Sequence, residues 1–261
     1  MIIDFHTHYT LGEVFVKKQY DADKVISEME ANSIVSQLLL PLDGLVFDYK
    51  EDNNRIMELV QTYPQRFVGM GTVHPRRPKE AVEEMDRCLQ SAGMIGMKFH
   101  PWLQAFSPLE DYFQSLAEEA NLRKTLFFFH DGTPPYTEPF QIAEVARANP
   151  DLTVVMGHSG LNDLWRESLL AARKYDNIWL CLCSCPYSGM LEIAQTLGGE
   201  RTIWGSDYPL ATARDTRDRI RQVEMLTVSD RVKEDILYHN ALKLITRFHP
   251  AFHSAKGKGP S

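Results

Sequence analysis

Short apolar segments recur along the whole chain, and their even spacing constrains the fold more than any other feature. One segment follows the next after roughly 25 to 35 residues, and the sequence between them is typical of amphipathic helices. Eight alternating strands and helices over about 250 residues predict an α/β fold, the (β/α)8 or TIM barrel. The apolar segments are MIIDF (1–5), IVSQLLL (34–40), FVGMGTV (67–73), MIGMKF (94–99), TLFFF (125–129), TVVMG (153–157), NIWLCLC (177–183) and TIWG (202–205).

The helical candidates support this reading. Several open with Asp, Ser or Pro and carry apolar residues at intervals of three and four. An open doubly wound sheet is the alternative, but no G-x-G-x-x-G loop follows the first segment. We expect one catalytic domain over 1–250 and a flexible tail over 251–261, which is polar and glycine-rich. The candidate helices span 21–32, 51–63, 78–90, 108–122, 138–149, 161–175 and 229–248.

Composition narrows the classes of partner. The chain has 28 basic and 35 acidic residues, and its net charge of -7 disfavours nucleic acid and anionic membranes. A small-molecule substrate fits this charge better than either of these partners. The apolar runs are too short to cross a bilayer, the N-terminus has no signal-peptide pattern, and four cysteines do not form a disulfide framework. We expect a cytoplasmic protein.

The segment IIDFHTHYT places two histidines one residue apart at the end of the first strand. Alternate side chains of a strand share a face, so His6 and His8 can offer two imidazoles to one metal ion. An H-x-H pair alone is more typical of an exposed strand end with incidental histidines. Further ligands have to come from other strands.

Other apolar runs also end in polar residues, at the end of a barrel where active sites lie. The run FFFH ends at His130, where an unpartnered imidazole beside a core would be costly. The runs VVMGH and TIWGSD end at His158 and Asp207, each after a glycine that allows close approach of the backbone. The fourth run carries Lys98, and the third is followed by His74.

The segments DFHTH, GMKFHP, FFFHDG, VVMGHSG, WGSDYP and ILYHNALKLI, taken together and in this order, resemble the amidohydrolase superfamily. The resemblance is strongest to the branch called the amidohydrolase-related, or decarboxylase-like, family and runs from residue 2 to about 247. It implies a metal-dependent barrel enzyme. Relatives in this family are often oligomers, so a homo-oligomer is also expected.

The resemblance implies a metal centre with four protein ligands. His6 and His8 would come from the first strand, His130 from the fifth and Asp207 from the eighth. Three nitrogens and one carboxylate suit a divalent ion, Zn²⁺ first, with one position open for water. His158 resembles the residue that in relatives contacts water and substrate or holds a second metal.

Lys98 decides between one metal and two. In two-metal members of the superfamily, a lysine of the fourth strand is carboxylated and bridges the ions. The motif KFHP also resembles the single-metal branch, in which the lysine is unmodified, and one ion is the preferred reading. His100 follows after two residues, and Pro101 indicates that the strand has ended by then.

The run CLCSCP suggests a different metal site. Cys181, Cys183 and Cys185 would share one face of a strand, and three thiolates of one extended strand cannot surround an ion. We therefore expect these cysteines to be packing residues of the seventh strand.

The leading hypothesis is hydrolysis of a small ester, lactone or amide. A metal-activated water would attack the carbonyl, Asp207 would take its proton, and His158 would bond the oxygen that gains charge. The alternative is non-oxidative decarboxylation of a small unsaturated or aromatic acid, in which a general acid protonates carbon. A third hypothesis is a barrel that binds without catalysis. In either reaction the expected substrate is a small molecule, and in decarboxylation it bears a carboxylate.

Overall fold

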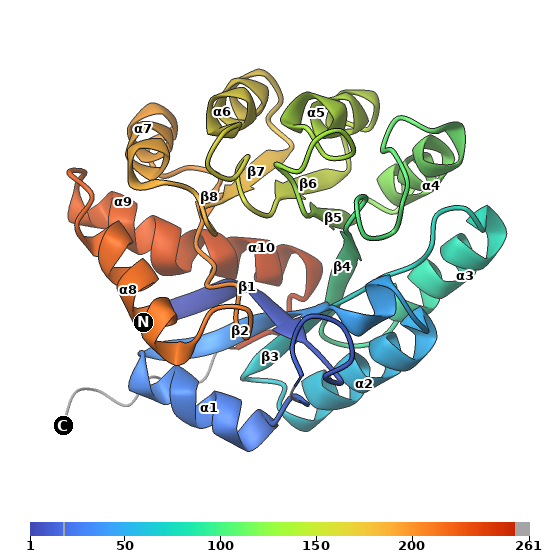
Figure 1. Ribbon diagram of the computed structural model, residues 1–261, viewed down its shortest axis with the longest axis horizontal. Helices are drawn as coiled ribbons and strands as arrows, with labels where there is room; N and C mark the ends of the chain where they lie inside the picture. The colour runs from blue at the N-terminus through green and yellow to red at the C-terminus, as the bar shows by residue number, and fades with distance from the viewer. Residues whose placement is uncertain (18, 254–261) are drawn as a thin grey trace.

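The computed structural model describes residues 1–17 and 19–253, and in it eight parallel strands follow one another around a barrel (Figure 1). Backbone hydrogen bonds close the seam beyond the last strand. The N–H of Phe5 donates to the carbonyl of Trp204 at 3.0 Å, and the N–H of Asp207 donates to the carbonyl of His6 at 2.8 Å. The TIM barrel predicted from the spacing is confirmed. The strands are β1 (Ile2–Tyr9), β2 (Ile34–Pro41), β3 (Phe67–Gly71), β4 (Met94–Phe99), β5 (Leu126–Phe129), β6 (Thr153–Met156), β7 (Ile178–Cys181) and β8 (Thr202–Ile203).

Helices surround the strands, including two that the sequence analysis missed. The first of these follows Pro186 and contains a glycine, and the second is so polar that its buried stripe is narrow. A capping box between Thr212 and Asp215 begins the second one. The helices are α1 (Ala22–Ala31), α2 (Tyr49–Thr62), α3 (Pro78–Leu89), α4 (Asp111–Leu122), α5 (Pro139–Ala148), α6 (Trp165–Lys174), α7 (Tyr187–Leu197), α8 (Ala213–Glu224), α9 (Asp230–Glu234) and α10 (Asn240–Phe248), with a 3-10 turn η1 (Asp43–Leu45) and a π-helical turn η2 (Asp235–His239).

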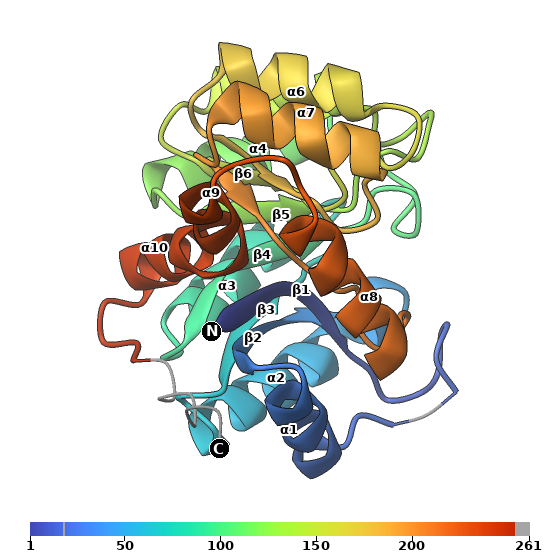
Figure 2. The ribbon, with the colours of Figure 1, turned by 90° about the vertical axis from the view of Figure 1, so that its left-hand side faces the viewer.

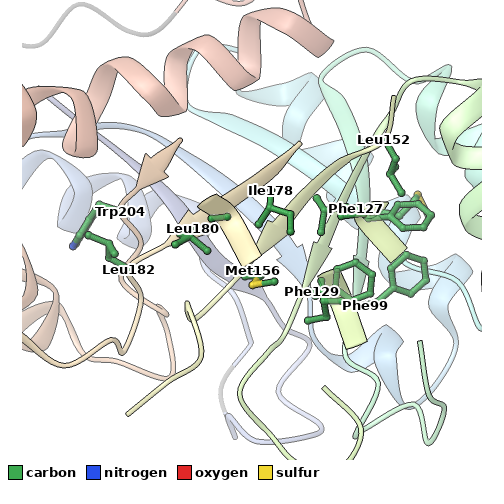
Figure 3. Close-up of a cluster of buried hydrophobic side chains, with 14 of the residues drawn as sticks. Phe99, Phe127, Phe129, Leu152, Met156, Ile178, Leu180, Leu182 and Trp204 are labelled. Carbon is green, nitrogen blue, oxygen red and sulfur yellow. The ribbon is translucent and has the colours of Figure 1, made fainter. Parts of the chain in front are cut away.

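The apolar core has two layers because the strand side chains alternate between the barrel interior and the helices. Figure 3 shows part of the outer layer, in which aromatic and aliphatic side chains of β4 to β7 pack together, with Trp204 just beyond β8. There the rings of Phe99 and Phe127 lie 4.8 Å apart, centroid to centroid, at an angle of 65°. Buried aromatic pairs of this kind stabilise the layer beyond their area alone.

The inner layer fills the barrel between the strands and α10. Ala241, Leu244 and Ile245 of this helix pack with inward-facing strand residues, and Figure 2 shows α10 at the end of the barrel where β1 begins. Phe252 is 3% exposed and joins the same layer, so packed structure continues into the segment that was expected to be a tail. Residues 254–261 of that segment lie outside the described residues. None of the described helices has the length and apolar character needed to span a membrane.

A buried carboxyl on α2 secures the turn after β2. Asp52 is 1% exposed, and its Oδ2 accepts the N–H of Gly44 at 2.8 Å. A Cβ on Gly44 would lie 2.7 Å from the Cβ of Asp52, so glycine is required for this approach. Burial raises the pKa of Asp52 to about 7, and the nearby Asp43 adds to the effect. The folded protein therefore holds this carboxyl neutral in weakly acidic solution.

We predict that Asp52→Asn changes the pH dependence of stability. In the unfolded chain Asp52 ionises near its usual pKa, whereas in the fold it stays neutral up to about pH 7, so the wild type loses stability as pH rises between these values. Asparagine keeps an oxygen acceptor for Gly44 and cannot ionise. The free energy of unfolding of the variant, relative to the wild type, should rise by about 2–4 kcal/mol between pH 4.5 and 7.5 in urea titrations.

Glu118→Gln, an exposed position on α4, is the matched control and should leave the pH profile unchanged. If the free energy of unfolding of Asp52→Asn differed from that of the wild type by the same amount at pH 4.5 and pH 7.5, the prediction would be contradicted.

Candidate metal centre at the carboxyl ends of the strands

A β-bulge in β1 directs both histidines of the H-x-H pair into the barrel. The pairing with β2 shifts between Asp4 and Thr7, where β1 has one residue more than its partner. Ile3, before the shift, and Phe5, within it, belong to the inner apolar layer. The extra residue changes the phase of the alternation, so His6 also faces the interior, 5.0 Å from the ring of Phe128, and His8 lies 5.1 Å from His6 between ring centroids.

The ring of His6 is oriented by the backbone of β6. Its Nδ1–H donates to the carbonyl of Gly157 at 2.9 Å, which leaves the Nε2 lone pair facing the site. This Nε2 is buried and has no hydrogen-bond partner among the described residues. A backbone carbonyl on the outer nitrogen is the usual support of a metal-binding imidazole.

Glycines let β8 and β6 approach this ring. A Cβ on Gly205 would lie 2.3 Å from the Cβ of His6, and one on Gly157 would lie 2.5 Å from the carbonyl oxygen of Phe129. Gly157 and Gly205 therefore allow the backbone to approach its neighbours closely. The close approach predicted from the glycines of VVMGH and TIWGSD is confirmed.

Asp207 completes a group of three donors. It lies just beyond β8 with φ at 67°, and its Oδ1 is 3.1 Å from Nε2 of His8 and 3.5 Å from Nε2 of His6. The three ligand atoms all lie within 4.8 Å of one another. Two imidazole nitrogens and a carboxylate oxygen suit a divalent ion of the Zn²⁺ or Mn²⁺ type.

The protonation states of this group favour a cation. Burial works to raise the pKa of Asp207, but the hydrogen bond from His8 and the proximity of His6 outweigh it and hold the pKa well below its usual value. Burial lowers the pKa of His6 far below its usual value. Near pH 7 the carboxylate is ionised and the His6 imidazole is neutral, which are the forms that bind metals.

His158 stands beside the three donors, as predicted. Its ring centroid is 4.7 Å from that of His6, and its Nδ1–H points toward the carbonyl of Cys183 at 3.3 Å. Burial lowers the pKa of His158 to about 4, so the ring is neutral at pH 7. Asp131 holds this segment, because its carboxylate accepts the N–H groups of His158 at 2.6 Å and Gly160 at 2.5 Å.

Asp131 is a site residue that sequence reasoning did not single out. It follows His130 directly in FFFHDG, and burial raises its pKa to about 6. The sequence does contain a signal for Asp131. Its carboxylate stands between a strand-end histidine and Gly132, where it can accept hydrogen bonds from neighbouring loops.

His130 lies next to His158 but outside the group of three donors. Its ring centroid is 4.5 Å from that of His158, and its Nε2 pairs with Oγ1 of Thr133 at 2.8 Å. His100 stacks on the other face at 3.7 Å and 11°. The ligand role of His130 therefore stays a prediction. His74 lies elsewhere, in a surface pocket shared with Arg77.

Lys98 is fully buried on β4 in the same region. Its Nζ lies 4.6 Å from the ring centroid of Phe128 and has no hydrogen-bond partner among the described residues. Burial lowers the pKa of Lys98 to about 8, and the charge of Asp207 works in the opposite direction. Such an amine holds its proton at pH 7 and releases it in mildly alkaline solution.

The three cysteines do not share one strand face, contrary to expectation. β7 ends at Cys181, and the chain then turns, so that Cys183 joins the inner layer and Cys185 the outer one. The Sγ of Cys183 lies with nitrogens of His6 and His158 in a second group of donors within 4.8 Å of one another. The sequence analysis considered Cys183 only together with Cys181 and Cys185 and took it as a packing residue, because it assumed a longer strand.

Solved structures of known decarboxylases have the same fold. A 5-carboxyvanillate decarboxylase from Novosphingobium aromaticivorans, complexed with manganese and 4-hydroxy-3-methoxy-5-nitrobenzoic acid, is 16% identical with a TM-score of 0.76, over 94% of this chain and 96% of that one. A dihydroxybenzoic acid decarboxylase from Polaromonas sp. JS666, with manganese and the inhibitor 2-nitroresorcinol, is 15% identical with a TM-score of 0.75 over the same shares.

An uncharacterised TIM-barrel protein from Bordetella bronchiseptica is 19% identical with a TM-score of 0.79, over 95% of this chain and 99% of that one. At these identities the likeness concerns the fold. The family is established by sequence, because the amidohydrolase family model matches residues 3–247. This match and the arrangement of the strand-end residues lead to one conclusion: the chain belongs to the amidohydrolase family.

Proposed function

We propose that this protein is a metal-dependent, non-oxidative decarboxylase of a small aromatic or unsaturated acid. The observation that carries the proposal is the buried group of His6, His8 and Asp207 beside an unpaired, buried Lys98. The fold shared with decarboxylases that bind manganese and aromatic acids or their analogues supports it. Hydrolysis, the leading hypothesis from sequence, becomes the competing outcome of the test.

Hydrolysis and decarboxylation place different demands on Asp207. In the hydrolytic scheme Asp207 has to take a proton from water and return it later. Decarboxylation needs no base, since its chemistry requires an acid that delivers a proton to carbon.

Lys98 supplies this acid. The bond between the substrate carbon and its carboxylate breaks, the electron pair stays on the carbon, and carbon dioxide leaves. That carbon takes a proton from Nζ of Lys98, which regains one from solvent, so the reaction consumes one proton and no oxidant. The lowered pKa of Lys98 makes this transfer easier than from an ordinary ammonium group.

The neighbouring side chains hold and orient the substrate. His158 is neutral, and Asp131 accepts its backbone N–H, so its Nε2 can accept a hydrogen bond from a hydroxyl group of the substrate without adding charge. A bound divalent ion would anchor and polarise the oxygens of the acid. His6, His8 and Asp207 would hold the ion, with His130 as the predicted fourth ligand; one ion, Zn²⁺ in the first instance, is our expectation. A homo-oligomer also stays a prediction.

We predict that the metal-loaded protein releases carbon dioxide from hydroxylated benzoic acids. The assay supplies dihydroxybenzoates and carboxyvanillate to protein loaded with Zn²⁺ or Mn²⁺ and measures carbon dioxide and the decarboxylated phenol in equal amounts. Removal of the metal with a chelator should stop the reaction, and reloading should restore it. Asp207→Asn should lower both bound metal and turnover by at least about 10-fold, since the carboxylate is a ligand.

A parallel panel of lactones, esters and amides tests the competing activity. Hydrolysis of any of these without carbon dioxide release from the acids would overturn the decarboxylase proposal and return the protein to the hydrolase class.

We predict that turnover falls as pH rises through about 8. Lys98 acts in its protonated form, and its proton is lost above the lowered pKa. Lys98→Met should reduce kcat by about 10²–10⁴-fold at pH 7 and remove the alkaline decline from any residual activity. The measurement is a pH–rate profile of kcat for both proteins, with melting temperatures to confirm folding.

Lys79→Met, an exposed position on α3, serves as the control and should behave as the wild type. A Lys98→Met variant with wild-type kcat would show that the proton comes from another group.

A further inference from the structure

Cys183 lies beside the candidate metal centre, although the sequence analysis assigned it to core packing. The residue is fully buried, two positions beyond the end of β7. Its sulfur and nitrogens of His6 and His158 are all within 4.8 Å of one another. Cys185 turns the opposite way, toward Trp165 and the outer layer, where its sulfur lies near Gly189.

His6 belongs to both groups of donors. Its Nε2 is 3.5 Å from Oδ1 of Asp207, and one of its ring nitrogens lies within 4.8 Å of a nitrogen of His158 and of the sulfur of Cys183. Because Nε2 of His6 is buried and has no hydrogen-bond partner among the described residues, it is a second, independent sign of a ligand at this point. Oxygen, nitrogen and sulfur donors therefore all lie close to the His6 ring.

The sulfur of Cys183 lies close to a positively charged side chain, Arg219. Nη1 of Arg219, on α8, lies 3.6 Å from Sγ of Cys183 and also donates to the carbonyl of Ser206 at 2.5 Å. The guanidinium favours the thiolate, but burial and the nearby Asp207 carboxylate outweigh it and hold the pKa of the Cys183 thiol well above its usual value, so the metal-free residue is a thiol. The Ser206 carbonyl bond ties the same arginine to the residue before Asp207, so the β7 and β8 ends of the centre share one support.

We propose that Cys183 is a ligand of the divalent ion and that its sulfur gives the centre a preference for zinc or cobalt over manganese. Thiolates are soft ligands that favour Zn²⁺, whereas Mn²⁺ favours oxygen donors. When the ion binds, the thiol proton passes to solvent and a sulfur–metal bond forms, so nothing is oxidised or reduced. The inference rests on the metal centre of the proposed function, but not on the reaction catalysed there.

The test uses the full-length protein, stripped with a chelator and titrated with Co²⁺. A thiolate bound to Co²⁺ adds a charge-transfer absorption in the near ultraviolet, whereas the visible bands of Co²⁺ report binding by any donors. The wild type and the control Cys185→Ser should show both signals. Cys183→Ser and Cys183→Ala should keep the visible bands and lose the near-ultraviolet absorption.

Competition between metals gives a second readout. Cys183→Ser should weaken Zn²⁺ binding by about 10–100-fold and change Mn²⁺ binding much less, so the ratio of the two affinities falls. Equal losses for both ions, or an unchanged near-ultraviolet absorption in Cys183→Ser, would overturn the inference.

The outcomes separate this inference from the proposed function. A sulfur-dependent absorption without carbon dioxide release would leave Cys183 as a ligand and reject the decarboxylase. Carbon dioxide release with no sulfur-dependent absorption in the wild type would reject Cys183 and keep the decarboxylase. A wild type that binds no Co²⁺ would refute the metal centre itself.

Discussion

The seam between β8 and β1 is the constraint on which the candidate centre depends. β8 is short, and the barrel closes only because the backbone beyond it pairs with β1, where the N–H of Asp207 reaches the carbonyl of His6. This bond joins the segments that carry two of the candidate ligands, His6 and Asp207. Asp4 reinforces it, since one carboxyl oxygen accepts the N–H groups of both His6 and Ser206. The seam therefore fixes the separation between these two side chains.

Burial determines the chemistry of the charged groups around this seam. It keeps His158 neutral and brings the pKa of Lys98 down to about 8, whereas Asp207 stays ionised because imidazoles surround it. One buried environment thus contains a neutral imidazole, an amine that loses its proton in mildly alkaline solution and an ionised carboxylate. Differences of this kind between neighbouring titratable groups are typical of active sites.

The spacing of apolar segments was enough to predict the barrel and to place His6, His8, His158 and Asp207 at one end of it, because strand ends of a parallel barrel meet there. It did not predict the bulge after Asp4, since one extra residue leaves no mark in the hydrophobic pattern. Helix α8 was missed because most of its surface is solvated. Cys183 was misplaced because a turn after β7, and not a continuing strand, sets its direction.

The end of the barrel that α10 covers limits how small molecules can enter and leave. α10, with Phe252, fills the end where β1 begins, and apolar side chains occupy the interior above it. Among the described residues, this packing leaves no second route for a compound that reaches the histidines. In the proposed reaction, carbon dioxide and the phenol would both leave by the path along which the acid entered, past the loops at the carboxyl ends of the strands.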